Sequence, residues 1–215
     1  MSIPRPKTRL FDAFTTNINY ARGLVKAGQS LADLEVTSFD TGDLYRAAWV
    51  QAVSALDHWL HEEIFARVAE LADNTGPGMP TALRNVQLPL SVVEQVRLDN
   101  LRLRDAVVDQ VKGKWATQSL QNPKEISSAL KLVCDDDVWS LVARQMNSWN
   151  NYAPPTWSRD AVSKRLSAVN RRRNEIAHAA DLDPTTGRRR PISYQDATDA
   201  VAWIDSIALA IAMVL

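Results

Sequence analysis

The sequence predicts an all-α protein, and three observations support this fold class. Apolar residues recur every three or four positions, and no run shows the strict alternation of apolar and polar residues that is typical of strands. Residues that start and stop helices stand at the ends of these segments. The 215 residues are 46% hydrophobic, which is sufficient for a buried core without disulfides or metal. We therefore expect one helical domain over residues 1–215.

The first part of the chain contains two strongly patterned segments. The first predicts a helix that stops near Gly28, with apolar positions at Leu10, Phe14, Ile18, Ala21 and Val25. Asp43 is expected to cap a second, longer helix. Its apolar positions are Tyr45, Ala48, Trp49, Ala52, Leu56, Trp59 and either Phe65 or Val68. Two glycines and two prolines then predict a loop over residues 74–80.

Residues 81–149 are less regular, and we interpret them as a helical insertion or a less typical middle part. Three helices are expected there, over Val92–Val111, Pro123–Val133 and Asp136–Met146. Pro123 suits the first turn of its helix, and Asp135 or Asp136 suits the cap of the next one.

Two helices are expected at the end of the chain. The first begins near Ser158, and its apolar stripe consists of Val162, Leu166, Val169, Ile176 and Ala180. A turn over residues 183–187 follows, and Ser193 can cap the last helix. From Ala200 to Leu215 only Asp205 and Ser206 interrupt an apolar run, which is too short for a membrane span and favours a core or dimer helix.

Charge and cysteine content indicate the class of protein. The formal net charge is zero, so the whole chain is not a polycation that coats nucleic acid. Residues 159–190 carry nine basic against four acidic residues, which a solvated basic face would also explain. Cys134 is the one cysteine, and two prolines and three basic residues stand between Pro4 and Arg9, where a signal peptide needs an apolar run. We expect a cytoplasmic protein.

The residues from Arg173 to His178 carry the main functional signal. Arg173, Asn174 and His178 fall within two turns of one predicted helix. At 100° per residue Arg173 shares the apolar face with Val169, so its guanidinium needs an acidic partner. We expect that partner to be Asp57 of the second helix.

His178 lies on another face of the helix, in line with Asn174 and Arg171. Histidine can transfer protons near neutral pH, and arginine binds phosphate and stabilises charge that develops on it. Such a set is sufficient for metal-free RNA cleavage by 2′-hydroxyl attack, which gives a 2′,3′-cyclic phosphate and a 5′-hydroxyl. The residues also fit a structural ion pair and a histidine at a helix end, and Arg171 or Arg172 fits looser spacings to His178.

The stretch from Arg173 to Asp181 resembles the signature of HEPN-domain proteins. In that signature four to six residues separate an arginine from a histidine, and the residue directly after the arginine is polar. Ala47–Glu63 is similar to the second helix of the RiboL-PSP-HEPN branch. The segment from Arg173 to Ser193 is similar to the last two helices of that branch and their connector. Residues 81–149 match only loosely, and Ala179 stands where the family often has glycine.

This resemblance implies an α-helical bundle of HEPN type that dimerises, with the two motif helices meeting across a cleft to form a composite RNA-cleaving site. It implies that Arg173 contacts the scissile phosphate, His178 transfers the proton and Asn174 positions them, with Glu175 and Arg171 in support. No cofactor is implied. Many members are toxins or antiviral defence effectors, for which an antitoxin protein is a partner, whereas other members are inactive binding domains.

Further residues have competing interpretations. Arg172 and the run Arg188–Arg190 are expected to contact RNA phosphates, although a solvated charge cluster explains the run nearly as well. His58, His61 and Glu62 share a helix face, but their order is not that of a zinc protease and we expect no metal. Among the seven tryptophans, Trp149 and Trp157 are the two that we consider for base stacking, with loop packing as the alternative.

The sequence therefore supports two hypotheses. The first is a metal-independent endoribonuclease that acts as a homodimer, and the second is a non-catalytic helical module that binds RNA, a nucleotide or a protein.

Overall fold

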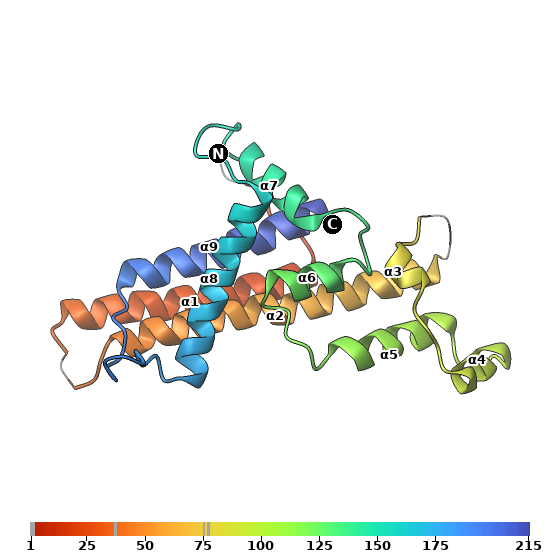
Figure 1. Ribbon diagram of the computed structural model, residues 1–215, viewed down its shortest axis with the longest axis horizontal. Coiled ribbons are helices and arrows are strands. Elements are labelled where there is room, and N and C mark those ends of the chain that lie inside the picture. The colour runs from red at the N-terminus through yellow and green to blue at the C-terminus, as the bar shows by residue number, and fades with distance from the viewer. Residues whose placement is uncertain (1–2, 37, 75, 77) are drawn as a thin grey trace.

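The chain is all-helical. This computed structural model describes residues 3–36, 38–74, 76 and 78–215, and within these ranges it contains helices and no strand (Figure 1). The only bridge between extended residues in the described part is an isolated one, between Leu182 and Arg189. The predicted all-α fold class is confirmed.

Three long helices form the body of the molecule, and each contacts the other two (Figure 1). They are α1 (Arg9–Asp33), α2 (Gly42–Asp73) and α9 (Tyr194–Val214). The rings of Phe11 and Phe14, near the start of α1, each lie 5.6 Å from the ring of Trp59 in α2. Because these aromatic side chains are almost fully buried, they contribute strongly to the hydrophobic core.

Gly28 does not end α1, which continues to Asp33. A Cβ atom at residue 28 would lie 2.6 Å from the ring of Tyr45 in α2. The glycine therefore permits close packing of two helices, and the expected stop near Gly28 is wrong.

A buried carboxylate joins the start of the chain to the last helix. Asp205 of α9 lies 2.5 Å from Arg5 and 2.6 Å from Arg22 of α1. Burial raises the pKa of Asp205, but the hydrogen bonds from the two guanidinium groups outweigh burial, so that this pKa is lowered. The ion pairs therefore compensate for a charge placed inside an apolar helix.

Two further helices pack on this body (Figure 1). They are α7 (Val138–Ser148) and α8 (Arg159–His178). Helix α8 begins directly after Ser158, where the sequence predicts its start, and the Ser158 side chain caps it by accepting from the backbone N–H of Ala161. Trp49 of α2 donates its indole N–H to the carbonyl of Val169, 2.9 Å away. This bond fixes the middle of α8 against α2.

Residues 81–130 form four shorter helices, which are α3 (Thr81–Arg84), α4 (Leu90–Arg97), α5 (Leu103–Trp115) and α6 (Pro123–Leu130). Of these, α5 and α6 pack against α2. The single helix expected over Val92–Val111 is wrong, because the chain turns between Leu98 and Arg102. Asp99 has a φ of 57° there, which no helix contains. Figure 1 shows α4 at the far end from the start of α9, where it contacts α5.

Helix ends in the structure test the predicted caps. Pro123 occupies the first turn of α6, and Ser193 and Asp196 form a capping box at the start of α9, as expected. Thr41 rather than Asp43 occupies the N-cap of α2, and Asp137 rather than Asp135 or Asp136 precedes α7. These two predictions are wrong by one or two residues.

The run Ala200–Leu215 was expected to be too short for a membrane span, but the whole of α9, with 21 residues, is long and apolar enough to span one by length and composition alone. Its most apolar window has a mean hydropathy of 1.6, and 61% of that window is buried inside the protein. The helix packs against α1, α2 and α7. Such burial is typical of a core helix.

Candidate functional site

The residues from Arg173 to His178 form the last turns of α8, and His178 is the last helical residue. The backbone N–H groups of Ala179 and Asp181 both donate to the carbonyl of Glu175, at 3.0 Å each. Ala180 and Asp181 then take φ values of 50° and 58°, which reverse the chain. Ala180, expected on the apolar stripe of the helix, is exposed and lies beyond the helix end.

Arg173, Asn174 and His178 line one open hollow of about 560 Å³. The hollow lies between α8, the start of α6 and the connector from α5 to α6. Its other lining residues are Gln118, Ser119, Gln121, Asn122, Glu125 and Asn170. The structure thus places the three residues singled out in the sequence on one surface, together with polar groups from distant parts of the chain.

Within the hollow, Arg173 donates from Nη1 to the side-chain oxygen of Asn174, 3.2 Å away. Its Nε is buried and has no hydrogen-bond partner among the described residues. His178 and Asn174 are exposed, whereas Arg173 is partly buried. Arg173 therefore presents a positive charge to the hollow while an adjacent amide orients it.

The expected ion pair between Arg173 and Asp57 is not formed among the described residues. Asp57 instead accepts from the backbone N–H of Leu120 at 2.5 Å and from the side-chain amide of Gln121 at 3.1 Å. This part of α2 faces the connector between α5 and α6, and that connector supplies one wall of the hollow. Asp57 supports the site by holding its wall.

The acid that the motif helix does engage is Asp181, which is fully buried. Arg172 lies 2.8 Å from one of its carboxylate oxygens, and Nε of Arg46 lies 2.8 Å from the other. Burial lowers the pKa of Arg46, but its hydrogen bonds to Asp181 and Asp40 raise this pKa above its ordinary value. Arg172 is therefore a structural residue, which ties the end of α8 to the start of α2.

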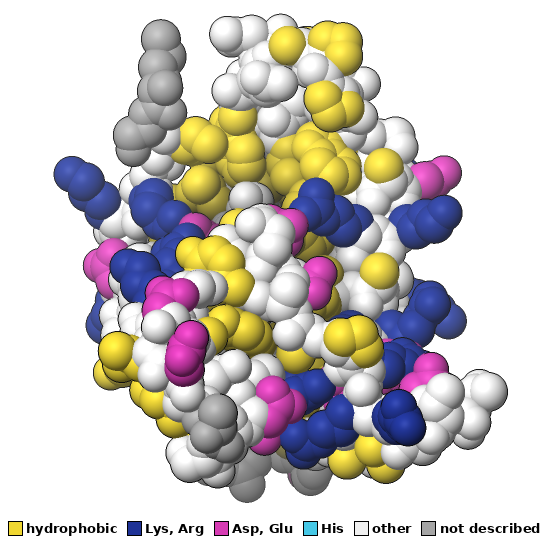
Figure 2. All heavy atoms as spheres, turned by 90° about the vertical axis from the view of Figure 1, so that its left-hand side faces the viewer, with side chains coloured by type: hydrophobic (Ala, Val, Ile, Leu, Met, Phe, Trp, Pro, Cys, Tyr) yellow, Lys and Arg dark blue, Asp and Glu magenta, His cyan; other side chains and the backbone are white. Residues whose placement is uncertain are grey.

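Two of the four other arginines near the motif are also paired. Arg190 forms an ion pair with Glu175, and Arg189 forms one with Asp43. Arg171 and Arg188 are exposed and form no ion pair with any described residue, and neither lines the hollow. Figure 2 shows the face of the molecule that lies on the left of Figure 1, and there Lys and Arg side chains lie among Asp and Glu side chains. The basic side chains do not form a continuous basic surface on this face.

Sequence reasoning missed most of the wall of the hollow. Asn170 was recognisable, because Asn170, Asn174 and His178 follow one another at intervals of four residues on one helix face. Glu125, Gln121 and the other residues of the wall come from a segment that the sequence does not place beside α8. One oxygen of Glu125 and the side-chain oxygen of Asn170 are buried without a hydrogen-bond partner in the described part of the chain.

The histidine pair of α2 does not form a metal site. Both ring nitrogens of His61 face backbone carbonyls, that of Asp57 at 2.8 Å and those of Trp115 and Gln118 at 3.0 Å. His58 is exposed, and no group of three metal-ligating side chains occurs among the described residues. His61 instead fastens the end of α5 and the connector to α2.

The two tryptophans considered for base stacking are packed. The ring of Trp157 lies 4.8 Å from that of Trp203, and the Arg165 guanidinium covers Trp203 at 4.3 Å. Trp149 packs against the hydrophobic core. These contacts favour the loop-packing interpretation of both residues.

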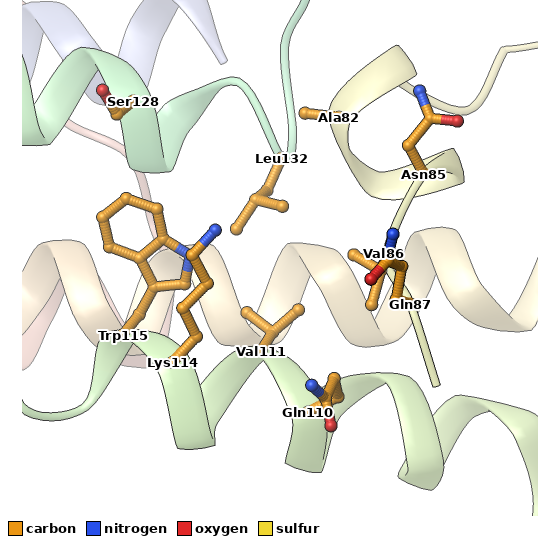
Figure 3. A pocket seen from close by; sticks show the side chains of 10 residues that line it. All are labelled: Ala82, Asn85, Val86, Gln87, Gln110, Val111, Lys114, Trp115, Ser128 and Leu132. Atoms are coloured by element: carbon orange, nitrogen blue, oxygen red, sulfur yellow. The ribbon is translucent and has the colours of Figure 1, made fainter. Parts of the chain in front are cut away.

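Another pocket, of about 340 Å³, lies between α3, α5 and α6 (Figure 3). Val111, Leu132 and Trp115 point into it, and Lys114 is its one charged lining residue. The lining contains no histidine, carboxylate or thiol, so the hydroxyl of Ser128 has no histidine or carboxylate in the lining to activate it as a nucleophile.

No protein-family model, no curated protein and no solved structure matches the chain.

Proposed function

We propose that this protein is a metal-independent endoribonuclease of HEPN type. The observation that carries the proposal is that Arg173, Asn174 and His178, which make up the motif of the resemblance, line a single hollow. A cation, an amide and an imidazole within one accessible site are a suitable set for phosphodiester cleavage.

Arg173 would bind the scissile phosphate. Its planar guanidinium matches two phosphate oxygens and can stabilise the charge of a phosphorane-like transition state. Of the three consecutive arginines it is the best placed to bind phosphate, because Arg172 forms an ion pair with Asp181 and Arg171 does not line the hollow. The bond from Arg173 to Asn174 would hold the guanidinium in position.

His178 would transfer protons. In the reaction a base takes the 2′-hydroxyl proton, the 2′-oxygen bonds to phosphorus as the bond to the 5′-oxygen breaks, and an acid gives a proton to the 5′-oxygen. An imidazole can serve in either role near neutral pH. Its exposed place at the helix end favours access to RNA.

One chain supplies one histidine to the hollow, whereas the reaction has a base step and an acid step. We therefore propose that two copies of the chain pair with their hollows facing each other, so that the second His178 supplies the other proton transfer. The HEPN resemblance supports this homodimer. It also supports a cytoplasmic toxin or antiviral defence effector that an antitoxin protein restrains.

The test is RNA cleavage by the purified protein in excess EDTA. Wild-type protein should cut single-stranded RNA and leave a 2′,3′-cyclic phosphate. His178→Ala should reduce the rate by about 100-fold or more, because positioned acid–base groups contribute roughly 10²–10⁴-fold. His58→Ala, which removes an exposed histidine outside the hollow, is the matched control and should leave the rate unchanged.

Intact RNA after incubation with wild-type protein, or equal cutting by His178→Ala, would reject the nuclease. RNA that binds without being cut, with binding weakened by Arg173→Ala, would instead identify the non-catalytic binding module.

A further inference from the structure

The hollow around His178 has an unusual lining for a phosphate site. Five of its nine residues carry carboxamide side chains, which are Gln118, Gln121, Asn122, Asn170 and Asn174. Arg173 is its one permanent cation, Glu125 is an anion, and the lining contains no apolar side chain. A carboxamide offers a donor and an acceptor side by side, which is the arrangement that nucleobase edges display.

Glu125 makes its part of the hollow suitable for hydrogen-bond donors and unsuitable for phosphate. A carboxylate only accepts hydrogen bonds, and it repels a phosphate placed beside it. One of its oxygens is buried with no donor among the described residues, and so is the side-chain oxygen of Asn170. Buried acceptors without donors are unfavourable and rare in proteins. Because Glu125 is only half-buried, rotation of its side chain would turn both oxygens towards the hollow, where a ligand with N–H groups would supply the missing donors.

The wall that carries the amides is held in place from behind. Asp57 accepts from Leu120 and Gln121, and His61 bonds to the carbonyl of Gln118. The side chain of Asn122 accepts from the backbone N–H of Lys124 and so caps α6 one turn before Glu125 reaches the hollow. These bonds come from the core helix α2 and from the helix start, so the wall is preorganised for a ligand.

We propose that this wall reads the base next to the scissile phosphate and that it selects guanine, a proposal that rests on the nuclease function. The Watson–Crick edge of guanine presents two adjacent donors, N1–H and the N2 amino group, to the two oxygens of the Glu125 carboxylate. Its O6 and N7 acceptors then meet the amide N–H groups of the wall. Adenine and cytosine pair their amino donor with a ring acceptor, and uracil has one donor between two acceptors, so each leaves Glu125 with an unfavourable contact.

The hollow would thus have two parts. Arg173 and His178 act on the phosphate, and Glu125 with the connector from α5 to α6 reads the base. Single-stranded RNA is commonly recognised in this way, through hydrogen bonds to exposed base edges.

The experiment uses the full-length protein and a set of nonamers of uridine whose central nucleotide is G, A, C or U. Wild-type protein should cut fastest beside the central G. Glu125→Gln replaces one acceptor with a donor and should reduce the preference for G by roughly 5- to 150-fold, the range of a bidentate base contact, while cutting continues. Glu94→Gln, an exposed glutamate on α4 outside the hollow, is the control and should keep the preference.

Binding to nonamers of the same sequences in which every nucleotide is 2′-deoxy, so that no 2′-hydroxyl can attack, separates this inference from the nuclease function. Tighter binding of the G nonamer that Glu125→Gln abolishes would support the inference even if no RNA were cut. Cutting or binding with no preference among the four nonamers, or the same preference in Glu125→Gln, would overturn the guanine subsite and leave the nuclease proposal standing.

Discussion

Arg172 and Arg173 are consecutive in α8 but have different environments, and the difference assigns a structural role to Arg172 and a candidate functional role to Arg173. The side chain of Arg172 is 17% exposed and pairs with Asp181, which has no exposed surface. Arg173 has no ion pair with any described residue and lines the hollow. A residue whose charge is already compensated within the fold is not free for a substrate phosphate, whereas Arg173 is.

Alanine substitutions should separate these roles. Arg172→Ala leaves Asp181 with one of its two guanidinium partners and should lower the free energy of unfolding by about 3 kcal/mol. Arg173→Ala breaks only a bond to Asn174 and should change it by no more than about 1 kcal/mol, yet reduce RNA cleavage by about 100-fold. Urea unfolding and cleavage rates for both variants measure the two effects. Equal loss of stability in the two variants would show that Arg173 is structural as well.

At the level of the helix, the end of α8 determines where His178 stands. The chain leaves the helix through Ala179 and then takes a left-handed conformation at Ala180. The HEPN signature often has glycine directly after the histidine, but the residue that needs the conformational freedom of glycine here is one position later. A left-handed alanine costs roughly 1–2 kcal/mol relative to a conformation that its Cβ allows.

Ala180→Gly should therefore stabilise the protein. The relief of strain exceeds the extra chain entropy of an unfolded glycine, and we expect a gain of about 0.5–1 kcal/mol in the free energy of unfolding. Ala179→Gly is the matched control. Its residue has a φ of −119°, so it gains no relief and should lose stability. Thermal or urea unfolding of both variants tests this, and destabilisation by Ala180→Gly would contradict it.

Helix positions were predictable wherever the cause is local. The caps Ser158 and Ser193 and the position of Pro123 follow from hydrogen bonds and ring geometry within one turn. The break after Leu98 was not predictable, since the charged and apolar residues on both sides fit one continuous helix. Gly28 was misinterpreted because its role depends on Tyr45, seventeen positions later in another helix.

For the whole molecule and its candidate site, too, features with a local cause were predictable and features that depend on tertiary packing were not. The motif of α8 was visible in the sequence, because its three residues are neighbours along one helix. The opposite wall of the hollow comes from residues 118–125 and meets α8 only through tertiary packing. The partner of Arg172 could not be assigned either, since Asp181 reaches it by reversal of the chain beyond the helix.

The proposed pairing of two chains makes a prediction that a single chain could not satisfy. If each site uses His178 from both copies, a dimer of one wild-type and one His178→Ala chain is inactive. Mixing equal amounts, with time for exchange of subunits, should lower the activity per wild-type chain to about half, because about half of the wild-type chains then lie in mixed dimers. A ninefold excess of the variant should lower it to about one tenth.

His58→Ala in the same excess should have no effect, since its dimers keep both copies of His178. Equilibrium ultracentrifugation at the assay concentration should detect the dimer independently of activity. Activity per wild-type chain that stays constant at every ratio would mean that one hollow acts alone. The second proton transfer would then need a group of the same chain or water, and the cutting site would be the single hollow of α6, α8 and their connector.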